Sequence, residues 1–258
     1  KDTYPDLYKA HISEVIKYYS THHDKSIQSL LLGRQLASDF YALSNQEAGT
    51  KFQQMVCQDA LQHYGASSYV YLQEKAQELN MLSSYDANTA RKQYPKLIKD
   101  MKNAGFDHSE IIADYATLEY GAQNNELAAK LYQQAYEESA NEGDTHKRAY
   151  FLLSELGPLK AIQNTERRQE EVYRQAQHIL DTNTDTLSWI CLNFEMAARY
   201  LNEKGMYKEA IEMIHRGIAT NDRLDLGCSN QYFNLLILQY QVYYYGLDDL
   251  STTYRLVN

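Results

Sequence analysis

The stretch Asn202-Glu-Lys-Gly-Met-Tyr-Lys-Glu-Ala-Ile-Glu-Met-Ile-His-Arg-Gly217 decides the fold of this 258-residue chain. Gly205 separates two helical patterns within it, because glycine is the usual residue at the end of a helix. Beyond this break, Ala210, Ile214 and Gly217 recur every three or four residues and so lie on one helix face. The small residues let two helices approach each other, and the large one fills the space between them. The stretch therefore predicts a tight helical hairpin.

The hairpin pattern repeats along the chain at an interval of 41 residues. The recurring positions are small (Ala135, Ala176 and Gly217) or large (Tyr132, Tyr173 and Ile214), and Gly246 follows Gly205 at the same interval. In the first hundred residues the matches are looser and the interval drifts by a few residues. A hairpin that recurs in this way is typical of repeat proteins, in which neighbouring units bury each other's apolar faces.

Helices are expected throughout, because only 3 prolines and 11 glycines interrupt the chain. The expected helices span residues 5–20, 25–43, 45–64, 66–82, 86–103, 108–122, 125–141, 144–163, 165–181, 184–203, 206–220 and 225–245, and a last one starts near Leu247. No Ser- or Pro-rich linker divides them, so we expect one domain over 1–258, with divergent repeats in 1–107 and clearer ones in 108–258. We expect the array to bend at Gly157-Pro158, since proline disrupts a helix.

The best-defined hairpin resembles a tetratricopeptide repeat (TPR). The residues that carry the resemblance are Phe194, Ala197, Ala198, Gly205, Tyr207, Ala210, Ile214 and Gly217, with a weaker copy at Tyr115, Ala116, Ala128, Tyr132 and Ala135. The interval is longer than the family's usual length of about 34 residues, and the proline that closes most repeats is missing. The resemblance implies an all-α, TPR-like superhelical solenoid of about six helical hairpins, similar to divergent arrays in bacterial sensor and regulatory proteins.

The charge and hydropathy of the chain exclude two classes of partner. The formal net charge is −9 and the sequence pI is about 5.4. Nucleic-acid-binding proteins neutralise phosphates with lysine and arginine, so we expect no nucleic-acid partner. No apolar run approaches the roughly 20 residues that cross a bilayer, so we expect no membrane span within this segment.

Motifs that would carry catalysis are missing. The sequence has no GxSxG, no glycine-rich phosphate loop and no HExxH. Glu212 and His215 share a helix face, as in di-iron bundles, but a second such pair is missing and we interpret them as a surface pair. His22-His23 has no distant ligand partner, so we expect no metal and no cofactor. A helical enzyme is the least favoured of the functions considered.

Cysteines and tyrosines leave alternatives open. Cys57, Cys191 and Cys228 read as small buried residues, with a Cys191–Cys228 disulfide as the alternative. The chain has 24 tyrosines, which pack between helices or else line a groove for peptides or sugars. The run Tyr243–Tyr245 cannot all face one side of a helix, so at least one member is expected to be exposed.

The resemblance also implies a binding surface. In TPR-like arrays the first helix of each hairpin lines the concave face, which in this sequence would place Glu195, Arg199 and Asn202 there. The equivalent positions of the repeat that starts near residue 109 are Ala113, Thr117 and Tyr120. Arg199 is the main candidate, because a guanidinium can hold a carboxylate through two hydrogen bonds, although a plain surface role is the alternative. The family's Lys/Asn clamp for C-terminal carboxylates is not reproduced.

We therefore expect a non-catalytic module that binds a protein or peptide partner, or alternatively a small ligand, within a bacterial signalling or regulatory protein. The alternatives are a cytoplasmic peptide-responsive regulator and an assembly scaffold. The last hairpin is incomplete at Asn258, so we expect a piece of a longer protein, tethered to a membrane downstream in one interpretation. This favours a periplasmic or extracytoplasmic location, while the unpaired cysteines favour the cytoplasm.

Overall fold

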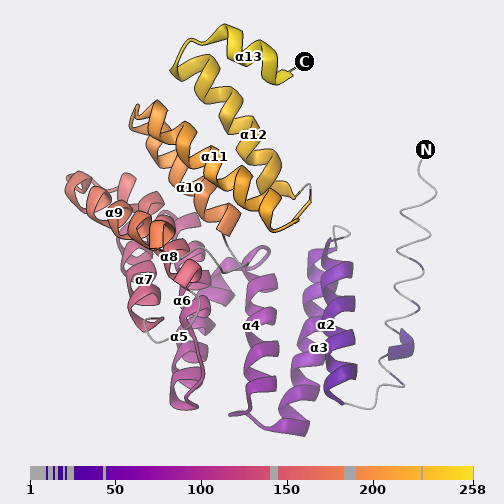
Figure 1. Ribbon diagram of the computed structural model, residues 1–258. Helices are drawn as coiled ribbons and strands as arrows, with labels where there is room; N and C mark the ends of the chain where they lie inside the picture. Colours follow the sequence, from indigo (N-terminus) through magenta and orange to yellow (C-terminus); the bar gives the residue numbers. More distant parts are fainter. Residues whose placement is uncertain are drawn as a thin grey trace. The chain divides into compact units, whose positions relative to one another are not determined.

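The computed structural model describes residues 10, 14, 17–19, 21, 26–42, 45–139, 145–182, 190–227 and 229–257. Within these ranges the chain forms helices and turns and no strand (Figure 1). The helices are α2 (Ile27–Ala42), α3 (Gln46–Tyr64), α4 (Tyr69–Ser83), α5 (Ala87–Asn103), α6 (Ser109–Gly121), α7 (Asn125–Glu138), α8 (Thr145–Lys160), α9 (Glu166–Thr182), α10 (Ile190–Glu203), α11 (Tyr207–Arg223), α12 (Asn230–Gln241), the π-helical turn η1 (Val242–Gly246) and α13 (Leu250–Val257). The all-α solenoid of helical hairpins that the sequence predicts is confirmed.

The expected helix over 225–245 differs from the structure at both ends. Asp225 and Gly227 have positive φ angles of 51° and 65°, which an α-helix does not allow. The helix starts instead after Ser229, whose hydroxyl accepts a hydrogen bond from the backbone N–H of Tyr232 at 3.1 Å. At its other end α12 passes into η1. Most of the expected helix over 5–20 lies outside the described residues.

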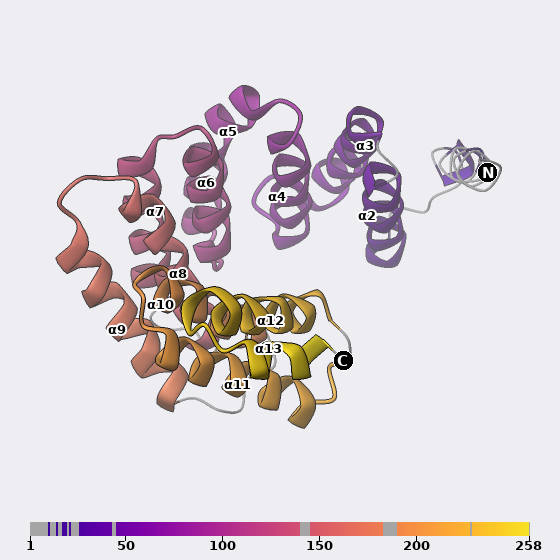
Figure 2. The same cartoon turned by 90° about the horizontal axis from the view of Figure 1, so that it is seen from above.

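The chain divides into two compact units, Lys1–Glu119 and Tyr120–Asn258, with the boundary inside α6. In each hairpin we call the first helix the A helix (α2, α4, α6, α8, α10 and α12) and the second the B helix (α3, α5, α7, α9, α11 and α13). In the second unit, α9 and α11 lie along the outer side and α8, α10 and α12 along the inner side (Figure 2). The second unit therefore presents a row of A helices on one side.

A small buried residue recurs on the B helices of the second unit. Ala135 in α7, Ala176 in α9 and Gly217 in α11 are all buried, as the 41-residue interval predicts. At Gly217 an added Cβ atom would lie 2.9 Å from both the Cβ of Phe194 in α10 and a methyl carbon of Leu235 in α12. The three helices converge there because that Cβ atom is missing.

The A helices also carry buried glutamates, and one of them, Glu195, was expected on the concave face. Each of Glu74, Glu119, Glu155 and Glu195 is buried and forms an ion pair with an arginine, respectively Arg34 (2.6 Å), Arg91 (2.7 Å), Arg168 (3.1 Å) and Arg199 (2.9 Å). The arginines come from different helices and from different distances along the chain, so no fixed spacing reveals the pairs. Burial raises the pKa of Glu155, and the nearby Arg168 guanidinium opposes that rise.

Replacing Gly217 with leucine should lower the free energy of unfolding by about 2–3 kcal/mol, because the new side chain would overlap Phe194 and Leu235. Gly121 is the matched control, since no atom lies within 4 Å of a Cβ atom added there. Gly121→Leu should stay within about 0.5 kcal/mol of the wild type in urea unfolding. Equal losses in the two variants would contradict the close approach at Gly217.

Replacing Arg168 with methionine should cost about 3 kcal/mol at neutral pH, because it leaves the buried Glu155 carboxylate without its partner. The double variant Arg168→Met/Glu155→Met should recover most of this loss. The loss of unfolding free energy in Arg168→Met should also become smaller as the pH falls, because protonation of Glu155 removes the uncompensated charge. Urea unfolding at several pH values measures both effects, and a deficit that persists unchanged in acid would refute the explanation.

Candidate functional site

A groove lies on the A helices of the second unit, with a volume of about 260 Å³. Its rim and walls come from α6, α8 and α10: Tyr120, Ser154, Gly157, Lys160, Met196, Arg199 and Glu203. Its floor is made by Tyr132, Leu153, Leu156 and Tyr200, which are all buried. We call this set of residues the A-helix groove.

Gly157 keeps the A-helix groove open beside Tyr120. The Tyr120 ring lies 3.2 Å from the position that a Cβ atom would occupy on Gly157. A larger residue at this position would therefore press on the ring and fill the groove. Tyr120 itself remains about two-fifths exposed, with a relative accessibility of 42%, so its ring is available to a ligand.

The buried carboxylate of Glu195 holds the Arg199 side chain in place. Its Nε and Nη2 atoms each lie 2.9 Å from Oε1 of the buried Glu195, and Oε2 of Glu195 accepts a hydrogen bond from Asn234 of α12 at 3.1 Å. The Arg199 side chain is still 46% exposed. Within the described residues its Nη1 makes no hydrogen bond, so this end of the guanidinium can donate to a carboxylate or a carbonyl oxygen.

The charges around the A-helix groove balance. Lys160 and Glu203 form an exposed ion pair at 2.6 Å across its rim, and Arg199 pairs with Glu195. Two cations and two anions leave no net field that would attract a ligand of one sign. Recognition in this groove must therefore depend on shape, hydrogen bonds and apolar contacts.

The structure brings together only some of the residues that the sequence singled out. Arg199 and Tyr120 line the same groove, and Glu195 lies beneath Arg199 as its support. Asn202 lines a separate hollow with Tyr207, Gln241, Tyr245 and Gly246, on the side of α10 that faces α12.

Thr117 and Ala113 belong to the first unit, outside the A-helix groove. Thr117 is exposed and its hydroxyl donates to the backbone carbonyl of Ala113 at 3.0 Å. Ala113 itself is buried. Neither residue therefore shares a surface with Arg199 within one unit.

The A-helix groove continues into exposed apolar residues of α12, which were not expected from the sequence. The exposed or partly exposed residues of α10 that face the groove side are Leu192, Met196, Arg199 and Glu203. Forty-one residues later the same positions hold Phe233, Ile237, Tyr240 and Tyr244, which we call the aromatic strip. Adding the 41-residue interval to Arg199 and to its neighbours on the same helix face gives the positions of the aromatic strip, so the sequence pattern could have located it.

The aromatic strip is unusually exposed for such residues. Phe233, Ile237 and Tyr244 have relative accessibilities of 50%, 54% and 40%, and the Tyr240 and Tyr244 rings stack with centroids 5.7 Å apart. The hydrogen bond between Asn234 and Glu195 joins α12 to α10. The aromatic strip on α12 therefore lies next to the segment of α10 that contains Arg199. Contiguous exposed apolar side chains of this kind mark interaction surfaces.

The tyrosine run Tyr243–Tyr245 shares Tyr244 with the aromatic strip, and at least one of its members is exposed, as the sequence predicts. Tyr245 has a relative accessibility of 75%, and it lies in η1 together with Tyr243 and Tyr244. Gly246 is required at the end of η1, since a Cβ atom there would lie 2.6 Å from the Tyr207 ring.

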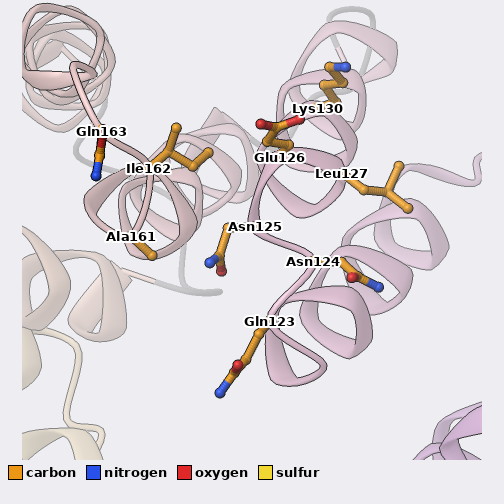
Figure 3. Close-up of a pocket in the computed structure, with 9 residues that line it drawn as sticks. All are labelled: Gln123, Asn124, Asn125, Glu126, Leu127, Lys130, Ala161, Ile162 and Gln163. Atoms are coloured by element: carbon orange, nitrogen blue, oxygen red, sulfur yellow. The ribbon is translucent and has the colours of Figure 1, made fainter.

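A wider hollow of about 880 Å³ lies between two A-to-B turns of the second unit (Figure 3). Gln123 and Asn124 come from the turn before α7, Asn125 begins α7, and Ala161, Ile162 and Gln163 come from the turn before α9. Most of these side chains are exposed, and the hollow is a depression between turns with no buried polar group directed into it. We assign no site to it.

The histidines and cysteines considered in the sequence analysis lie apart from the groove, as far as the structure describes them. His215 bonds to Gln239 at 2.8 Å, and no group of three His, Cys, Asp or Glu side chains in the described ranges could hold a metal ion. Cys57 and Cys191 are buried and unpaired, and burial raises the pKa of the Cys57 thiol, which makes it a poor nucleophile. Cys228, His22 and His23 lie outside the described residues. None of the helices searched in the described ranges is long and apolar enough to span a membrane.

Comparison with known proteins bears on the fold alone. No protein-family model and no curated protein matches the chain. Among solved structures, a protein of Podospora anserina described as a kinesin light chain, with nearly identical TPR-like repeats, is similar at a TM-score of 0.54 and 12% sequence identity. The match covers 80% of this chain and 100% of that chain. The chain therefore has the all-helical TPR-like repeat fold.

Proposed function

We propose that the A-helix groove and the aromatic strip together bind an extended peptide segment of a partner protein. On this proposal the chain is a non-catalytic interaction or sensing module of a bacterial signalling or regulatory protein. The observation that carries the proposal is the run of exposed side chains at equivalent positions of α10 and α12, which continues the groove into an apolar surface. Repeat proteins commonly use such extended surfaces for binding.

The arrangement favours a particular kind of peptide. Packed helices lie about 8–10 Å apart, and an extended peptide advances about 3.3 Å per residue. A peptide that crosses the A helices thus passes a new helix about every three residues. We expect apolar side chains over Phe233 and Ile237, and a carboxylate or carbonyl oxygen about three residues away at the free Nη1 of Arg199.

The same surface would serve a cytoplasmic peptide-responsive regulator or an assembly scaffold, which differ from a sensor in compartment and output. The balanced charges of the groove favour a peptide over a small anionic ligand, because no excess positive charge is present to hold one.

The test is a selection of random linear peptides on the immobilised chain, followed by measurement of their dissociation constants. Ile237→Asp should raise Kd by about tenfold or more, because it places a charge where the peptide's apolar side chain packs. Arg199→Gln should weaken those peptides that carry a carboxylate.

Leu127→Asp provides the matched control. Leu127 is an exposed leucine of α7 outside the A-helix groove and the aromatic strip, with a relative accessibility of 40%. This variant should bind the selected peptides as the wild type does. Peptides whose Kd is insensitive to Ile237→Asp but rises in Leu127→Asp would place the binding surface elsewhere.

A further inference from the structure

A small cavity lies between α9 and α11, apart from the A-helix groove. Its volume is about 110 Å³, and Tyr173, Met206, Glu209, Glu212, Met213 and Arg216 are among the residues that line it. We call it the α9–α11 pocket. Since one water occupies about 30 Å³ in the liquid, the pocket has room for a few waters or for the end of one alkyl chain with its polar group.

Tyr173 points to a missing occupant. The residue is 7% exposed, and its hydroxyl is buried without a hydrogen-bond partner. Its ring is held against Tyr200, with centroids 4.7 Å apart, which limits how far the hydroxyl can move to find one. A buried hydroxyl without a partner is costly, so a group inside the pocket that bonds to it would stabilise the structure. Burial also raises the pKa of Tyr173, so the hydroxyl keeps its proton. The lone pairs of its oxygen can still accept a hydrogen bond.

The charges around the α9–α11 pocket select a cation. Glu209 and Glu212 are exposed carboxylates that make no ion pair within the described residues. Arg216 is engaged elsewhere, since it bonds to the Asp181 carboxylate at 2.7 Å and to the Leu180 carbonyl at 3.1 Å. The charged groups that line the pocket are two carboxylates and one guanidinium, and Asp181, which is not part of the lining, neutralises that guanidinium.

We propose that the α9–α11 pocket binds a primary alkylammonium group, as carried by lysine side chains and by free amines. An ammonium has three N–H donors, and the pocket offers three matching acceptors in the Tyr173 hydroxyl and the Glu209 and Glu212 carboxylates. The apolar walls at Met206 and Met213 suit the attached methylene groups. A quaternary ammonium would need a cage of several aromatic rings, and Tyr173 is the one ring that lines this pocket.

The test is a titration of the whole chain, labelled at its methionine methyl groups, with n-butylammonium and followed by NMR. The methyl signals of Met206 and Met213 should shift and saturate in the millimolar range, because so small a ligand brings little binding energy. The neutral analogue n-butanol should not saturate them. Glu209→Gln/Glu212→Gln should weaken binding by about tenfold or more, and Tyr173→Phe by less.

Glu170→Gln is the matched control, since Glu170 is an exposed acid of α9 outside the pocket, paired with Arg174. It should leave the titration unchanged, and thermal unfolding of each variant verifies that it folds. Shifts with n-butanol equal to those with n-butylammonium, or a titration that Glu209→Gln/Glu212→Gln does not alter, would overturn the proposal. An absence of any shift would mean that the pocket holds only water.

A second arm separates the two sources of the ammonium group. N-acetyl-lysine methylamide should saturate the same methyl signals if a lysine side chain of a partner can reach the pocket. Saturation by n-butylammonium alone would restrict the site to free amines. Neither result depends on peptide binding in the A-helix groove, so this proposal and the proposed function can fail separately.

Discussion

The close approach of three helices at one small residue per repeat is the constraint on which the second unit depends. At Gly217 the absence of a side chain lets α11 touch both Phe194 of α10 and Leu235 of α12. Ala135 and Ala176 hold the same place in α7 and α9. The A helices are buried on the side that faces these contacts, and among the described residues of α10 and α12 the exposed ones lie on the opposite side. The proposed binding surface is therefore a consequence of how the hairpins pack.

The buried glutamates link this packing to the groove. Removing an arginine partner from a buried carboxylate is costly, so each pair fixes the position of its arginine. At Glu195 the carboxylate also accepts a hydrogen bond from Asn234, which joins α12 to the same network. Arg199 is thus positioned by the core and by the next repeat together.

The places of residues that recur at an interval of 41 could be predicted from the sequence. The places of residues that depend on a contact with a neighbouring helix could not. The interval predicted the helical hairpins and the buried positions of Ala176 and Gly217, whereas the expected place of Arg199 came from the TPR resemblance. Asn202 was misjudged as a neighbour of Arg199 in the groove because a shift of three residues turns a side chain about 60° around the helix, here toward α12. The glutamate–arginine pairs could not be predicted, because the two partners lie between 4 and 40 residues apart with no fixed spacing. The aromatic strip was overlooked because phenylalanine and isoleucine are usually buried.

The central claim is that the A helices of the second unit form the binding surface. Hydrogen–deuterium exchange of the chain, with and without a selected peptide, tests it most directly, because the experiment reports every helix at once. The account predicts slower amide exchange in α10 and α12 when the peptide is bound, with α9 and α11 less affected. Slower exchange confined to α9 and α11, with α10 and α12 unchanged, would contradict it.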